Sequence, residues 1–208
     1  MNVTTMSSST WYRVLLENNI THRVDENGTT ELKPSRTELN HPDRNWELIW
    51  PLATTPGLPS ELTSFLWLLF HNILPTRERL HHLNMPNITN PLCDLCNLNT
   101  TETLHHALLQ CPNNSSSGNF LLNCMQVISP ALQSEQILLF NFDIQQDMKL
   151  PVMYIFSSIL FQTWSCRKAR RPCNMPSIRA TLEAGVQILR KSRHQKASEK
   201  IEEILVAV

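Results

Sequence analysis

Apolar residues are gathered into runs that proline and polar residues separate, and the spacing within most runs is helical. Trp46, Ile49 and Trp50 recur at i, i+3 and i+4, which predicts one face of a short helix. Residues 61–73 are almost continuously apolar and follow Ser60, a residue type that caps helix N-termini. This pattern predicts a central helix that other elements contact on most sides.

The remaining runs predict further helices with capping or terminating residues at their ends. Thr76 can cap a short helix, and Pro151 suits the first turn of a long apolar helix that ends at Trp164. This run contains polar residues and is shorter than the ~20 residues of a membrane span, so a buried helix is expected. Ser177 can cap a last helix that ends near Leu205. These three helices are expected at residues 77–83, 150–164 and 177–205, and two shorter apolar segments predict helices at residues 121–128 and 134–140.

Residues 1–45 carry weaker signals. Ser9 or Thr10 could cap a short helix that includes Trp11, whereas residues 21–45 look irregular and residues 25–28 carry a turn signal. The first ten residues are polar and contain no apolar leader segment, so we expect an intracellular protein, nuclear or cytoplasmic and not secreted.

Composition supports a helical fold. The 208 residues include only 4 glycines but 13 prolines, which favours helices interrupted by prolines over a glycine-rich sheet. We therefore expect an all-α protein with a long basic C-terminal helix. Its expected parts are an N-terminal segment (residues 1–45), a helical domain (46–165) that contains a small turn-helix module (92–112), and a basic C-terminal helical arm (166–208).

Charge is divided unevenly although the formal net charge is zero. Residues 167–208 contain 10 Lys or Arg and 4 Asp or Glu, which gives +6, so residues 1–166 carry −6. A charge run is often no more than a solvated face. The alternative is that these cations contact phosphates of RNA or DNA, which gives salt-dependent affinity without sequence readout. The candidate phosphate contacts are Arg167, Lys168, Arg170, Arg171, Arg190, Lys191 and Arg193.

Candidate metal chemistry is concentrated in residues 92–112. Cys93 and Cys96 form a C-x2-C pair, and a histidine and Cys111 follow within nineteen residues of Cys93. Three thiolates and one imidazole form a complete tetrahedral ligand set for zinc, with no position left for a substrate. We therefore expect zinc to hold the turn-helix module of residues 92–112. We expect Asn99 and Glu102 to start the helix that carries the histidine, as a cap and a capping-box partner.

Alternatives remain at this point. The adjacent residues His105 and His106 point about 100° apart on a helix, so spacing alone does not select the ligand. The C-x2-C pair could be a redox pair, but no strand precedes it as in thioredoxin-type motifs, and the thiols could also be buried without a metal. Three other histidines, His71, His81 and His82, are expected to have structural or solvated roles.

A wider set of motifs resembles a known family, the zinc-binding region at the C-terminal end of reverse transcriptases from non-LTR retrotransposons. The order and spacing of the whole set carry the resemblance, and in that family the histidine lies four residues after the glutamate and five before the last cysteine. The matching motifs are Trp46-Glu-Leu-Ile-Trp50, Phe65-Leu-Trp67 with His71, Leu74-Pro-Thr-Arg77 with Leu80, Cys93-x2-Cys96, Glu102-Thr-x2-His106 and Cys111-Pro112.

The resemblance implies zinc as the cofactor and Cys93, Cys96, His106 and Cys111 as its ligands. It also implies a non-enzymatic domain that assists RNA or DNA engagement beside a polymerase. The chain itself shows no cluster of aspartates for two-metal nucleotidyl transfer. A second interpretation is a detached retrotransposon remnant that serves as a structural or protein-interaction module and docks onto a polymerase or another protein through apolar helices. No membrane partner is expected.

Overall fold

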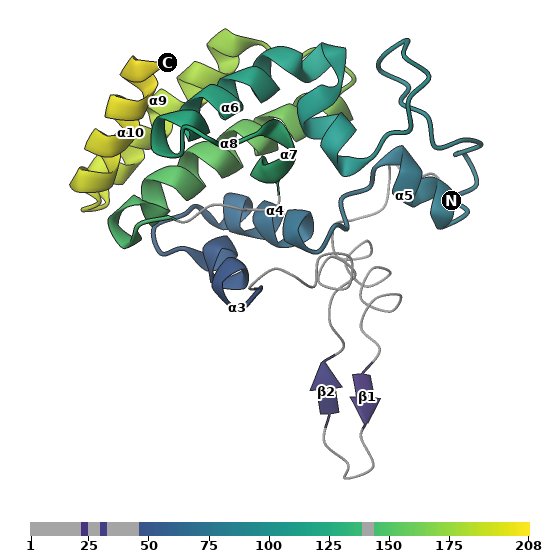
Figure 1. The fold of residues 1–208 in the computed structure, drawn as a ribbon, viewed down its shortest axis with the longest axis horizontal. Coiled ribbons are helices and arrows are strands. Elements are labelled where there is room, and N and C mark those ends of the chain that lie inside the picture. The colour runs from purple at the N-terminus through teal and green to yellow at the C-terminus, as the bar shows by residue number, and fades with distance from the viewer. Residues whose placement is uncertain (1–21, 25–29, 33–45, 139–143) are drawn as a thin grey trace.

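The computed structural model describes residues 22–24, 30–32, 46–138 and 144–208 (Figure 1). The expected all-α class is confirmed, since α-helices form most of this part of the chain. The predicted helix near Trp11 and the turn at residues 25–28 lie outside the described residues. The α-helices are α3 (Trp46–Ile49), α4 (Ser60–Phe70), α5 (Arg77–His82), α6 (Ser115–Ile128), α7 (Ser134–Ile137), α8 (Lys149–Lys168), α9 (Met175–Lys191) and α10 (Gln195–Ala207).

Short elements complete the described structure. The 3-10 turns are η2 (Trp50–Thr54), η4 (Pro112–Asn114) and η5 (Gln146–Met148), and η3 (His106–Gln110) is a π-helical turn. The irregular segment expected at residues 21–45 also contains two strands, β1 (His22–Val24) and β2 (Thr30–Leu32), paired antiparallel with Arg23 opposite Glu31. Strands of three residues are too short to give a recognisable alternation of apolar and polar residues.

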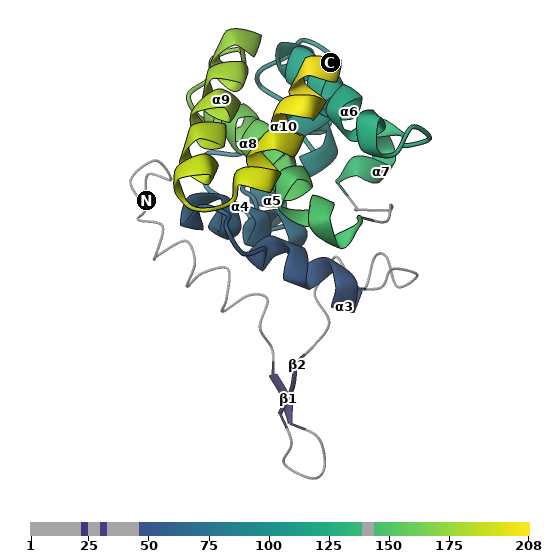
Figure 2. The ribbon, with the colours of Figure 1, turned by 90° about the vertical axis from the view of Figure 1, so that its left-hand side faces the viewer.

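Helix α8 lies at the centre of the helical body and contacts α4, α6, α9 and α10 (Figure 2). Its residues Val152, Phe156, Ile159 and Leu160 are fully buried, which confirms the buried helix expected from the apolar run. Low exposure on all sides of a helix is the arrangement that an apolar sequence without a polar face predicts. No described helix has both the length and the apolar character needed to cross a membrane.

Helix α4 does not have the central position that its apolar composition suggested. It buries Phe65, Leu66 and Phe70, but Ser60 and Glu61 at its start are exposed and Trp67 is half-buried. It packs against α8 at the edge of the body, so the central position expected for it belongs to α8. Ser60 also makes no capping bond and is the first helical residue. A nearly continuous apolar run does not show which of two such helices has neighbours on more sides.

Helix α5 begins as predicted. The Oγ1 atom of Thr76 accepts a hydrogen bond from the backbone N–H of Arg79 at 3.3 Å, which satisfies one of the unpaired donors of the first turn. Arg77, the first residue of α5, reaches the turn containing Cys93 and Cys96, where its Nη1 lies 3.2 Å from the Asp94 carboxylate.

The C-terminal part differs from the single long helix predicted between Ser177 and about Leu205. It forms two helices, α9 and α10, separated at residues 192–194, where Arg193 has a left-handed backbone conformation (φ 68°). The cap of α9 is Asn174, whose Oδ1 accepts the N–H of Ser177 at 2.8 Å. The break has no proline or glycine, so the sequence gives no local signal for it.

Residues 166–208 pack into the common core and do not form a projecting arm. Ile178 and Leu182 of α9 and Ile201 of α10 are fully buried in the same hydrophobic cluster as α8. Gly185 makes the close approach of α9 to α8 feasible, because a Cβ atom there would lie 1.4 Å from the Tyr154 hydroxyl oxygen. The division into residues 1–45, 46–165 and 166–208 stays a prediction.

Candidate metal centre

A tight turn brings the first two cysteines together. Leu92 and Thr101 form an isolated antiparallel bridge, and the N–H of Cys93 donates to the Thr100 carbonyl oxygen at 2.9 Å. Asn99 adopts a left-handed conformation (φ 49°), a position that asparagine tolerates better than most residues. Asn99 is therefore part of the turn. The prediction that it caps the following helix is wrong.

The helix that follows starts one turn later than predicted. Its cap is Thr103, whose Oγ1 accepts the N–H of His106 at 3.0 Å, and Glu102 makes no capping box. From His106 onward the helix widens to π geometry, and the N–H of Cys111 donates to the His106 carbonyl at 2.8 Å. This bond spans five residues, as in a π-turn, and it draws His106 and Cys111 to the same side.

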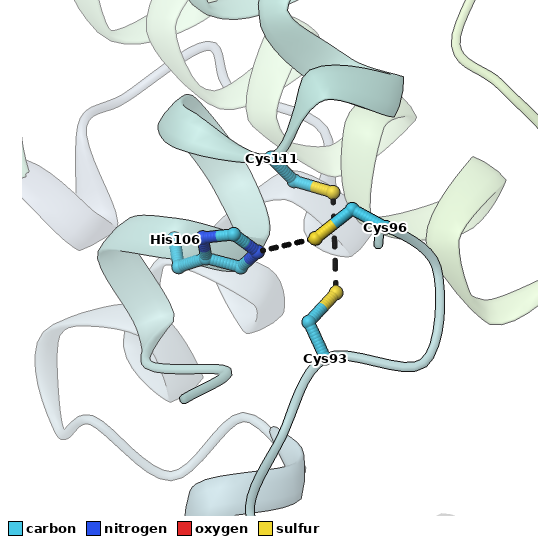
Figure 3. Close-up of side chains that lie close together, drawn as sticks. All are labelled: Cys93, Cys96, His106 and Cys111. Carbon is cyan, nitrogen blue, oxygen red and sulfur yellow. Dashed lines mark hydrogen bonds between the residues drawn. The ribbon is translucent and has the colours of Figure 1, made fainter. Parts of the chain in front are cut away.

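The four predicted ligands converge on one point. One ligand atom from each of Cys93, Cys96, His106 and Cys111 lies within 4.8 Å of the others (Figure 3). The Sγ atoms of Cys93 and Cys111 are 4.0 Å apart, and Cys96 Sγ lies 3.5 Å from His106 Nε2. Zn–S bonds of about 2.3 Å and Zn–N bonds of about 2.0 Å in a tetrahedron require S···S near 3.8 Å and S···N near 3.5 Å. The donor set and its spacing therefore fit zinc.

Burial favours the neutral forms of three of the four ligand groups when no cation is bound. Cys93, His106 and Cys111 are buried, and Cys96 is half-buried. Burial raises the pKa of Cys93 to about 12 and also raises the pKa of Cys111. Burial lowers the pKa of His106, which keeps its imidazole neutral and able to donate a lone pair. Because thiolates are the ligand form, binding of a metal would release the cysteine protons.

The other histidines lie elsewhere. His105 directs its Nε2 toward the Ser134 carbonyl oxygen at 3.4 Å, away from the thiols. His71 stacks on Trp50 and lies tilted against Trp67, while His81 and His82 form a ring pair in α5. None of them belongs to the metal-binding group found in the described residues. The Sγ atom of Cys96 lies beside His106 and that of Cys93 beside Cys111, so both cysteines of the C-x2-C pair face the shared group of four ligands.

Sequence reasoning missed the buried charges beside the metal centre. Glu102 has a side chain that is 0% exposed, and it forms an ion pair with Arg167 of α8, which is 12% exposed. The backbone N–H of Arg77 donates to the same carboxylate oxygen of Glu102 at 2.7 Å. Arg167 also lies over the Trp164 ring, with 4.9 Å between its Cζ atom and the ring centroid. Partners that lie 65 residues apart leave no local pattern that could have revealed this pair.

The predicted phosphate contacts form two separate groups. Arg167 and Lys168 end α8, Arg170 and Arg171 follow it directly, and Arg170 pairs with Asp94 of the cysteine turn. The remaining three lie at the end of α9, where Arg190 pairs with Glu202. The seventeen residues of α9 span about 25 Å at 1.5 Å per residue. All seven are exposed except Arg167, which is held against Glu102.

The other three cysteines, Cys124, Cys166 and Cys173, are buried and form no disulfide.

Comparisons with known proteins agree with this geometry. A protein-family profile described as "zinc-binding in reverse transcriptase" matches residues 32–116, a range that contains all four converging ligands. No curated protein and no solved structure matches the chain. The resemblance and the predicted zinc cofactor are therefore confirmed, whereas the assignment of the four ligands stays a prediction.

Proposed function

Because residues 32–116 belong to the zinc-binding domain family of reverse transcriptases, we propose that Cys93, Cys96, His106 and Cys111 hold one zinc ion and that the domain assists nucleic-acid engagement. The observation that carries the first part is the convergence of four ligand atoms from a turn and a π-helical turn. The second part rests on the cations beside that centre, and it requires its own test.

A structural role for the metal follows from the ligand set. Three thiolates and one imidazole fill a tetrahedral shell, which leaves no coordination position for a substrate or an activated water. The ion, when bound, supplies a crosslink between residues 93–96 and residues 106–111. Such a crosslink holds a segment that has little regular backbone pairing of its own, because residues 92–101 contain a single isolated bridge. The domain is non-catalytic, in agreement with its family.

Phosphate contact is supported by the surface next to the cysteine turn. Lys168 and Arg171 are exposed and form no ion pair with any described residue, and Arg170 is 70% exposed. Neutralising phosphates with such cations releases counterions, so affinity should depend steeply on salt and only weakly on sequence. The cations at the end of α9, Lys191 and Arg193, provide a second and separate group.

We expect the full chain to bind labelled RNA and DNA oligonucleotides in fluorescence anisotropy titrations, with affinity that falls as salt rises. The double variant Lys168→Ala/Arg171→Ala should lower the slope of log K against log salt by about 2, because two phosphate contacts are lost. Lys149→Ala/Lys196→Ala removes the same charge at other positions and should leave the slope unchanged. Equal slopes for both double variants, or no binding at all, would refute this assignment.

The same titration separates the two groups of cations. Lys191→Ala/Arg193→Ala should change the slope only if a ligand extends along α9 for about 25 Å. A long duplex should then show the effect and a short oligonucleotide should not.

Docking to a polymerase or another protein through apolar helices has less support. That interpretation predicts an exposed apolar patch on α4, whereas Phe65, Leu66, Leu69 and Phe70 are buried in the core of the described structure. Apolar docking would also be insensitive to salt, so the titration above distinguishes it from phosphate contact.

A further inference from the structure

The cysteine turn is tied by two carboxylates to arginines from distant parts of the chain. Asp94 lies between the ligands Cys93 and Cys96, and it pairs with Arg77 at the start of α5 at 3.2 Å and with Arg170 beyond the end of α8. Glu102, at the other end of the turn, accepts the N–H of Arg77 and pairs with Arg167. Two ion pairs therefore connect the turn to the end of α8.

The segment that receives these contacts is a short basic turn, residues 167–171. The N–H of Arg170 donates to the Arg167 carbonyl and that of Arg171 to the Cys166 carbonyl, both at 3.0 Å. Arg170 has a left-handed backbone (φ 51°), a conformation with a cost for a residue that carries a Cβ atom. Among the described residues, the ion pair with Asp94 is an interaction outside the turn that can offset this cost.

Two buried cysteines flank the basic turn. Cys166 precedes it and is 2% exposed, and Cys173 follows it and is 6% exposed. Cys173 lies near the buried hydroxyl of Thr163, with 3.9 Å between Sγ and Oγ1. Because these buried thiols lie directly before and shortly after the basic turn in the sequence, we expect a change in its conformation to expose them. They are therefore natural reporters of its conformation.

We propose that the metal-binding turn controls the conformation of the basic turn, so that zinc occupancy determines how Lys168, Arg170 and Arg171 are presented at the surface. This inference rests on the proposed function and adds that zinc regulates the group of cations proposed to contact phosphates. The coupling itself is a property of the protein alone and is measurable without nucleic acid.

The physical basis is the position of both carboxylates relative to the ligands. Asp94 is adjacent to Cys93 and two residues from Cys96, so the backbone that bears it is constrained when both cysteines hold one ion. Glu102 precedes His106 by four residues and is fully buried, so it tolerates little displacement from Arg167. Without the ion, the isolated bridge at Leu92 is the main backbone pairing that fixes the turn. Arg167 and Arg170 would then lose carboxylate partners that are held in fixed positions.

Thiol labelling of the full chain tests the coupling. The protein is loaded with one equivalent of zinc or treated with a chelator, exposed to an alkylating reagent, and each cysteine is then quantified by peptide mass spectrometry. We expect chelation to accelerate labelling of Cys166 and Cys173 on the order of tenfold, because labelling of a buried thiol follows the local opening equilibrium. Cys124, which is fully buried in α6 near the middle of the body, serves as the internal control and should change little.

Variants that retain the metal ligands isolate the ion pairs. Asp94→Asn should keep zinc, as measured by elemental analysis, and still accelerate labelling of Cys166 and Cys173. Asp147→Asn removes the same charge from an ion pair with Lys200 near the opposite end of α8 and should have no such effect. The Asp147 carboxylate is 64% exposed and has one partner, whereas that of Asp94 is 26% exposed and has two, so this variant controls for the loss of a surface charge.

Two results would overturn the proposal. One is unchanged labelling of Cys166 and Cys173 after zinc removal. The other is equal acceleration at Cys124, which would show that zinc loss unfolds the whole body without a specific connection to the basic turn. Absence of nucleic-acid binding by a protein that shows the expected labelling would count against the proposed function and leave the coupling intact.

Discussion

Replacement of Cys111 by serine is expected to abolish the contribution of zinc to stability, which for such sites is on the order of 10 kcal/mol at neutral pH. Cys111 is buried, and its N–H bond to the His106 carbonyl ties the thiol to the same π-helical turn as the imidazole. Serine keeps this backbone bond but supplies a poor zinc ligand. The loss therefore reports on the metal and not on the helix.

The response to a chelator makes this expectation diagnostic. Thermal unfolding of the wild type, followed by circular dichroism, should shift to lower temperature when a chelator is added. Cys111→Ser should melt near the chelated wild type and show no further shift. Cys124→Ala also alters a buried cysteine, but one that lies outside the metal-binding group, so it should keep the full chelator response. A Cys111→Ser protein that still responds to the chelator would contradict the assignment.

The second large effect is expected at the buried ion pair. Glu102→Gln should lower the free energy of unfolding by about 3–5 kcal/mol, because it leaves the Arg167 guanidinium buried without a counter-charge. Glutamine has nearly the shape of glutamate and can still accept the Arg77 N–H, so the loss derives mainly from charge. Chemical denaturation of the zinc-loaded protein measures it.

An exposed pair provides the matched control. Glu202→Gln removes the same charge from the pair with Arg190, where both side chains are about 40% exposed, and should cost less than about 1 kcal/mol. A double variant, Glu102→Gln with Arg167→Met, should recover much of the loss, because no unpaired charge remains. Equal effects of Glu102→Gln and Glu202→Gln would show that burial of Glu102 does not determine its contribution.

Local chemistry explains which features were predictable from the sequence. The zinc ligands lie within nineteen residues, so their types and spacing define the set before any fold is known. The cap at Thr76 and the buried helix α8 were also correct, since each depends on residues that are close in sequence. The choice of His106 over His105 came from the resemblance and agrees with the position of its Nε2 beside Cys96.

The errors arose where distant contacts decide the structure. Glu102 was expected to be a capping residue, but its carboxylate is held by Arg77 and Arg167 from two other helices. The C-terminal helix was expected to be continuous, but it breaks at residues 192–194 so that α10 can return along α9 and bury Ile201 and Ile204. Neither outcome follows from propensity, because residues with ordinary helical preference occupy both places.

Metal content tests the central claim most directly. Elemental analysis of the purified chain under reducing conditions should find one zinc per chain in the wild type and in His105→Ala, and none in His106→Ala. The two substitutions remove adjacent imidazoles, so they share most nonspecific effects and differ in whether the ring faces the thiols. A wild type without zinc, or a His106→Ala protein that retains zinc while His105→Ala loses it, would contradict the proposed metal centre.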